Sequence, residues 1–226
     1  MFAARAQPEA PSKPIFDGAL AKLFGNNTRF SASIDFHVTR FSGGELSMEG
    51  KIAVLDGKSR VDMDLSNVRG ASVSPEAAAQ MKEMGMSKMT AITLRDKKLS
   101  YIVYPDMKAY LESAGRETGT APAEYKTKVT KLGEETVDGR NCVKDKVSVT
   151  GPDGFTHEST VWYAPDLNQF PVEIQTTSEK GVSTVMIFKD VKLGKPDAAQ
   201  FDIPADFTKY DNMLNLMMSR ARKAPQ

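Results

Sequence analysis

Apolar and polar residues alternate along most of this chain. A period of two residues is typical of a strand that buries one face and exposes the other. The pattern gives roughly ten or eleven strands, without an internal repeat and without regular alternation of strands and helices. It therefore predicts a mainly β (α+β) fold, a large curved antiparallel sheet or unclosed β-barrel of about ten or eleven strands.

The first three strands form a meander whose register follows from its turns. Asp56-Gly57 is a strong signal for a two-residue hairpin, and it places Ile52 opposite Val61. A three-residue loop at Ser42-Gly43-Gly44 places Val38 beside Met48. In this register one face carries the apolar residues of all three strands: Ile34, Phe36, Val38, Met48, Ile52, Val61 and Met63.

The polar face of the same meander aligns Asp35, Lys51 and Asp62 as a ladder of alternating charge. His37 lies on this face with a carboxylate on each side, and such a histidine is a candidate base. On an open polar face it is more often a solvated cross-strand partner, and we interpret His37 in that way.

A second hairpin turns at 151–154. With a four-residue loop, Trp162 faces Val143 on the apolar side of this hairpin, and His157 lies on the polar side. His157 is then six residues along the strand from Cys142, roughly 20 Å at ~3.3 Å per residue. A thiol–imidazole pair is therefore not predicted.

Three segments are predicted to be helical: 15–25, 75–84 and 211–223. Ser74 is a natural N-cap and Pro75 suits the first helical position of the second segment. The third segment ends in three cations, which favour the negative end of the helix dipole. We interpret it as a helix packed on the domain, and a helix lying on a membrane surface is the alternative.

Four of the twelve methionines fall in residues 80–89. Gly85 predicts a left-handed helix end at which Met86 packs on Met81. Flexible thioethers also suit a lid over an apolar cavity. Thioethers bind Cu(I) as well, although no His or Cys lies nearby in the sequence. Core packing, a lid and a copper site are the three hypotheses for this segment.

Charge and composition exclude several functions. The chain has 30 basic and 29 acidic residues, which gives no electrostatic reason to bind nucleic acid. A single cysteine excludes an intramolecular disulfide and a zinc motif. No apolar run reaches the ~20 residues of a membrane helix, and no nucleophile, zinc-protease or nucleotide-binding motif occurs. We predict a protein that is not an enzyme, carries no cofactor and has no transmembrane segment.

Residues 1–14 are rich in Ala and Pro, and we expect them to be a disordered segment or the remnant of a signal peptide. Ala4-Arg5-Ala6 fits the small-x-small pattern that signal peptidase cleaves. Without an N-terminal cysteine, a lipoprotein anchor is not expected. The chain is therefore predicted to be secreted.

Three stretches carry a resemblance to a known family: FSASIDFHVTRFSGGELSMEGKI at 30–52, LRDKKLSYIVYPDMKAYL at 94–111 and DAAQFDIPADF at 197–207. They resemble the strand and turn patterns of the bacterial periplasmic lipoprotein-localisation carriers, the LolA/LolB/LppX-like superfamily. VWYAPDLNQFPVEIQ at 161–175 is similar to poorly characterised relatives of these carriers. The resemblance implies a single domain over 15–226, with helices plugging the concave face of the sheet and acyl chains held there.

The pattern and the resemblance together predict a periplasmic binding protein that holds a lipid, an acyl chain or a lipoprotein moiety in an apolar cavity for envelope transport. An envelope protein is a further expected partner. The alternatives are a structural or protein-interaction module of the envelope without a cavity ligand, and a Cu(I) binder. The predicted cavity and lid residues are Ile34, Phe36, Val38, Ile52, Met63, Met81, Met84, Met86 and Trp162.

Overall fold

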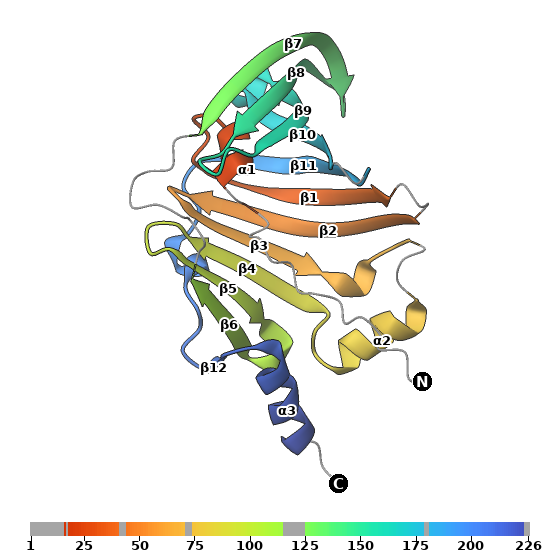
Figure 1. The fold of residues 1–226 in the computed structure, drawn as a ribbon, viewed down its shortest axis with the longest axis vertical. Helices are drawn as coiled ribbons and strands as arrows, with labels where there is room; N and C mark the ends of the chain where they lie inside the picture. Colours follow the sequence, from red (N-terminus) through yellow and green to blue (C-terminus); the bar gives the residue numbers. More distant parts are fainter. Residues whose placement is uncertain are drawn as a thin grey trace.

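The computed structural model describes residues 16, 18–40, 44–70, 74–114, 125–178 and 181–223. Within them, twelve strands form one curved sheet that does not close into a barrel (Figure 1). The sheet order is β12-β6-β5-β4-β3-β2-β1-β11-β10-β9-β8-β7. The predicted fold class is therefore confirmed. Residues 1–14 lie outside the described residues.

The strands have these bounds: β1 Arg29–Arg40, β2 Gly44–Leu55, β3 Lys58–Asp64, β4 Lys88–Leu94, β5 Leu99–Tyr104, β6 Ala109–Ala114, β7 Lys126–Val137, β8 Arg140–Thr150, β9 Thr156–Ala164, β10 Phe170–Thr177, β11 Ser183–Leu193 and β12 Thr208–Tyr210. The helices are α1 (Gly18–Leu23), α2 (Pro75–Glu83) and α3 (Met213–Lys223), and the 3-10 turns are η1 (Leu65–Asn67), η2 (Pro105–Met107), η3 (Pro165–Leu167) and η4 (Ala198–Phe201). The three predicted helical segments thus contain helices, each shorter than its segment. Neighbouring strands are antiparallel except β12, which runs parallel to β6.

The first meander has the predicted faces and the predicted pairs between β2 and β3, but not the predicted pairs between β1 and β2. Asp56 and Gly57 have positive φ, as a two-residue hairpin needs, and Ile52 pairs with Val61. Arg40 pairs with Gly44, so residues 41–43 connect β1 to β2, and Val38 lies beside Leu46 instead of Met48. This difference of two residues keeps every side chain on its predicted face.

Of the predicted charge ladder of the first meander, the pair of Lys51 with Asp62 is confirmed, whereas the pair of Asp35 with Lys51 is wrong for the same reason. Asp35 pairs with Glu49 instead of Lys51, and its carboxylate is neutralised by Lys189 on β11, at 2.7 Å. His37 pairs with Ser47, and its Nδ1 lies 3.0 Å from the Ser47 hydroxyl oxygen. The two carboxylates predicted beside His37 are not its strand partners.

The turn of the second hairpin is one residue longer than predicted. Each side chain of β9 therefore lies on the face opposite to the predicted one. Thr150 pairs with Thr156, so the turn has five residues instead of four. Its backbone explains the length: the Gly151 N–H donates to the Phe155 carbonyl (2.9 Å), and the Phe155 N–H donates to Asp153 Oδ1 (3.2 Å). Trp162 therefore pairs with Lys144 instead of Val143.

The two faces of the sheet are covered by different parts of the chain. We call the face with Ile34 and Phe36 the inner face, and the face with Asp35 and His37 the outer face. One row of paired residues crosses the inner face from β1 to β8: Phe36, Met186, Ile174, Val161 and Asp145. Figure 1 shows α1 inside the curve of the sheet, between β8 and β1.

The C-terminal segment covers the outer face of β2 to β5. Phe201 of η4 is fully buried against apolar side chains of this face: Ala53, Leu55, Ile92, Leu94 and Val103. Arg60 holds the segment in place, because its guanidinium donates to the Gln200 carbonyl (2.7 Å) while it pairs with Asp62 (2.8 Å). The segment 197–207, which is one of the three stretches that carry the family resemblance, therefore covers apolar side chains of the outer face.

Helices α2 and α3 lie toward the β12 end of the sheet (Figure 1). Ser74 caps α2 as predicted, since its hydroxyl oxygen accepts from the Ala77 N–H (3.2 Å), and Gly85 follows α2 with positive φ. On α3, Leu216 is buried against Tyr104 and Ala109. The helix α3 thus packs on the sheet, as its sequence indicates.

Candidate functional site

A pocket of about 190 Å³ lies between α1 and the inner face of the sheet. Helix α1 contributes one wall, and strands β8 to β11 contribute the other. The lining residues are Ala19, Leu20, Leu23, Val149, His157, Ser159, Thr176 and Met186. The pocket thus joins a segment near residue 20 to strands that follow more than a hundred residues later.

The lining of this α1 pocket is apolar on the helix side and mixed on the strand side. His157, Ser159 and Thr176 provide the polar groups. His157 is exposed whereas Ser159 is buried, so the polar side of the pocket reaches the surface at His157. Apolar walls with a few polar groups are the usual composition of a site for a small amphipathic molecule.

Aromatic packing holds α1 on the sheet. Phe24, directly after α1, stacks on Phe30 with ring centroids 4.9 Å apart, and it meets Phe170 and Phe188 edge to face at 5.4 Å each. At the start of the helix, Gly18 lies so close to the Tyr125 ring that a Cβ would overlap it. The pocket is therefore framed by close contacts at both ends of α1.

A partly buried carboxylate lies farther along the inner face. Asp145 pairs with Val161, and its Oδ1 is buried without a hydrogen-bond partner among the described residues. Burial raises the pKa of Asp145 above its ordinary value. Burial, and then the charge of Asp145, raise the pKa of Tyr163 to about 12. An ionised group is disfavoured at this position, because the surroundings are apolar.

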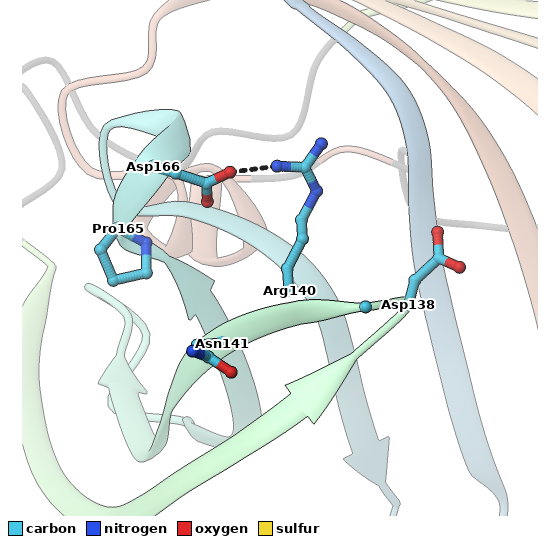
Figure 2. Close-up of a pocket in the computed structure, with 6 residues that line it drawn as sticks. Asp138, Arg140, Asn141, Pro165 and Asp166 are labelled. Carbon is cyan, nitrogen blue, oxygen red and sulfur yellow. Dashed lines mark hydrogen bonds and ion pairs between the residues drawn. The ribbon is translucent and has the colours of Figure 1, made fainter.

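A larger and more open pocket, of about 620 Å³, is polar. Figure 2 shows its residues around the β7–β8 turn and η3, where Arg140 and Asp166 form an ion pair. The lining residues are Asp138, Gly139, Arg140, Asn141, Pro165 and Asp166. Since it has no large apolar side chain, it does not suit an acyl chain.

Trp162 does not line the inner face. It pairs with Lys144 and Glu173, whereas Val161 carries the inner row, so Trp162 lies on the outer face. Its indole N–H donates to Glu135 Oε2 (3.0 Å), and Lys144 Nζ lies 4.7 Å from the ring centroid. The predicted pair of Trp162 with Val143 is wrong, because the hairpin turn is one residue longer than assumed, yet Trp162 is 5% exposed and belongs to the main core cluster.

The predicted site residues form three groups: Trp162, the strand residues of the first meander, and the methionine segment. The strand residues lie on the inner face. Ile34, Phe36, Ile52 and Met63 are buried on the inner face within the main core cluster, and Val38 is partly buried in the same strand as the first two. Their role in ligand binding stays a prediction.

The methionine segment is the third group, and it lies apart from α1. Met81 is partly buried on α2, and Met84 directly after it is 36% exposed. Met86 packs in a separate cluster with Leu216 of α3. The pocket between the sheet and a helix is thus covered by α1, and no described residue of α2 lines it. The sequence predicted the helix at 15–25, yet its few apolar residues gave no sign of where it would dock.

Other site chemistry is sparse in the described part of the chain. No group of three or more His, Cys, Asp or Glu side chains is arranged there to hold a metal ion. Cys142 is buried, and burial raises the pKa of its thiol, which makes it a poor nucleophile. Among the described helices, none has the length and apolar character needed to cross a membrane.

Comparisons with known proteins concern mainly the fold. A family model described as Domain of unknown function (DUF4412) matches residues 42–170. No curated protein matches the chain. An uncharacterized conserved protein from Thermus thermophilus has a similar structure, with a TM-score of 0.50 at 14% identity over 85% of this chain and 96% of that chain. At this identity the likeness shows the fold alone.

Two further solved structures are similar at lower scores. A LolA superfamily protein from Nitrosomonas europaea matches with a TM-score of 0.44 at 10% identity, over 80% of this chain and 93% of that one. The lipoprotein LppX from Mycobacterium tuberculosis matches with a TM-score of 0.43 at 10% identity, over 78% and 94%. A LolA superfamily protein and LppX are thus among the structures to which this chain is similar, in line with the resemblance that the sequence indicates.

Proposed function

Since the chain belongs to the family described as a domain of unknown function (DUF4412), we propose its function from its own site: a periplasmic, non-enzymatic binding protein that holds the acyl chain of a lipid or lipoprotein beneath α1. The observation that carries this proposal is the pocket between α1 and the inner face, with apolar walls and a polar mouth at His157. Acyl chains bind in such sites because burial removes their methylene groups from water.

The size of the pocket implies that α1 moves when a ligand enters. Ligand pockets generally measure about 300–1,000 Å³, and this one measures about 190 Å³. An acyl chain would therefore replace part of the contact between α1 and the strands. In this proposal α1 acts as the lid, the role that the sequence predicts for the methionine helix.

The build of α1 is compatible with a lid. It has six residues, and a helix of that length is not stable without its packing partners. Leu20 and Leu23 face the pocket, so an acyl chain could offer them the same apolar surroundings that the strands offer now. Lid opening would then cost little apolar burial.

A pair of neighbouring substitutions tests the site. Thr176 lines the pocket, whereas Thr177 is the next residue of β10 and is exposed. We expect Thr176→Trp to fill the pocket and to weaken binding of a dansyl-labelled fatty acid at least about tenfold, a change of about 1.4 kcal/mol. Thr177→Trp adds the same indole elsewhere and should bind like the wild type. Fluorescence titration measures both, and equal binding by the two variants would contradict the proposed site.

A protein-interaction module is the second candidate function. Strand β7 lies at an edge of the sheet, and its Val129 and Leu132 are more than half exposed. Unpaired edge strands with exposed apolar residues are sites where other chains can add a strand. Native mass spectrometry of protein purified without detergent separates the two candidates. A co-purifying lipid mass supports the carrier, and a ligand-free mass that persists after incubation with lipid vesicles supports the module.

A further inference from the structure

Helix α3 has an apolar side chain on each of two opposite faces. Leu216 is 1% exposed and packs on Tyr104 and Ala109. Leu214 and Met218 are 66% and 47% exposed and lie four residues apart, hence one above the other on the opposite face. A helix that only packs on a sheet needs one apolar stripe. The second stripe therefore lacks a structural explanation within the described residues.

The charge of α3 is positive. Its sequence, MLNLMMSRARK, contains no Asp or Glu and places three cations in its last four residues. The Arg220 guanidinium lies 3.5 Å from the Met84 carbonyl oxygen, which brings the end of α2 beside α3. Met84 is itself 36% exposed. Arg220 follows Leu216 by four residues and so lies on the packed face, whereas position 222, also an arginine, follows Met218 by four residues and continues the exposed face.

We propose that Leu214 and Met218 of α3, together with the adjacent cations, dock the protein on an anionic membrane surface. Helices that lie in the interface of a bilayer combine an apolar stripe with Lys and Arg in this way. The cations favour an anionic lipid surface over an uncharged partner, because each one near such a surface adds to the attraction. Figure 1 shows α3 at one end of the molecule, beside β6 and β12.

Binding to the membrane through this surface is expected to be weak and reversible. Two apolar side chains insert far less surface than a lipid anchor, and even a single myristoyl chain binds only marginally. The docking surface and the α1 pocket lie toward opposite ends of the sheet, since β12 and β6 are separated from β8 to β10 by β5 to β1 and β11. The proposal is therefore independent of acyl binding, and either function can fail alone.

Vesicle co-sedimentation tests the surface. The full chain is mixed with vesicles of phosphatidylcholine alone, or of phosphatidylcholine and phosphatidylglycerol in equal parts. We expect binding to the anionic vesicles only, and a loss of binding as salt is added, because salt screens exposed charges. The double variant Leu214→Ser and Met218→Ser should bind at least about tenfold more weakly.

Phe155 provides the matched control. It is 69% exposed on the β8–β9 turn, so Phe155→Ser removes an equally exposed apolar side chain far from α3. This variant should bind vesicles like the wild type. The proposal is overturned if both vesicle types bind equally, if neither binds, or if the double variant binds as well as the wild type. It is also overturned if the double variant instead abolishes a dimer seen by analytical ultracentrifugation, which would assign the surface to a second copy.

Discussion

At the scale of single residues, we expect Asp145 to lower the stability of the folded protein at neutral pH. It presents a carboxylate to an inner-face row that is otherwise apolar, and its Oδ1 lacks a hydrogen-bond partner among the described residues. Lys131 pairs with it across β7 and β8 and favours the charged form, but burial is the stronger influence and raises the pKa above 3.8. The folded protein therefore binds this proton more readily than the unfolded chain does.

The sign of the pH dependence follows from that difference. Stability associated with Asp145 is fully present below its unfolded pKa and is lost as the pH rises through the raised, folded pKa. We expect Asp145→Asn to raise the melting temperature at neutral pH, and the gain to shrink as the pH falls toward 3.8. Thermal unfolding followed by circular dichroism across this range measures the effect.

Glu158 is the control for this measurement. Its pKa is lowered, first by the hydrogen bond from Lys146, so its stabilising contribution is present above 4.5 and lost as the pH falls. Glu158→Gln should therefore lower the melting temperature at neutral pH, opposite in sign to Asp145→Asn. A melting temperature of Asp145→Asn below that of the wild type at neutral pH would show that the charge is better compensated than the geometry indicates.

At the scale of elements, turn length decided which sequence predictions hold. The Asp56-Gly57 turn has the length that its residues predict, and its pairs are correct. The β1–β2 connection differs from its prediction by two residues in register, which preserves faces, so Ile34 and Phe36 are inward as predicted. The β8–β9 turn is one residue longer than predicted, which places Trp162 on the outer face of the sheet. Hydrogen bonds at Phe155 set that difference, and the hydrophobic pattern of the strands does not report them.

Helix position was less predictable than helix existence. The residues of α2 and α3 predict both helices through a cap, a proline and an apolar stripe, all of which are local features. The place where a helix docks depends on strands distant in sequence, such as β8 and β11 for α1. Methionine density at 80–89 indicated adaptable packing, yet it carried no information about which part of the sheet α2 would meet.

The attachment of α1 can be tested through Phe24. Its ring is 2% exposed and contacts four other rings, those of Phe16, Phe30, Phe170 and Phe188. We expect Phe24→Ala to lower the free energy of unfolding by about 3–5 kcal/mol, since it leaves a cavity in a packed core. Urea denaturation measures the loss. A loss below about 1 kcal/mol would mean that α1 is not packed on the sheet in solution.

At the scale of the whole molecule, one sheet connects every described strand. The row from Phe36 to Asp145 joins β1 to β8, and the outer-face cluster around Phe201 joins the C-terminal segment to β2. Neither end of the chain has a core of its own, because each packs against strands that come from the other part of the chain. Unfolding of one end should therefore remove the partners of the other.

A single unfolding transition is the expected outcome. Trp162 is the only tryptophan of the chain and reports on β9, whereas far-ultraviolet circular dichroism reports on the whole sheet. We expect the two signals to give the same midpoint in urea, as cooperative unfolding requires. Separate midpoints would show that the β7–β10 end unfolds apart from the rest.

The pairing of β1 with β11 has a consequence for how the chain is made. The two strands are neighbours in the sheet, yet some 140 residues separate them in the sequence. During synthesis one edge of β1 stays unpaired until almost the whole chain has emerged. Helix α1 likewise has no packing partner until β8 and β10 have been made. Contacts at such separations form slowly and leave apolar surface uncovered meanwhile. The fold is thus completed at its middle, and the pocket beneath α1 is among the last features to form.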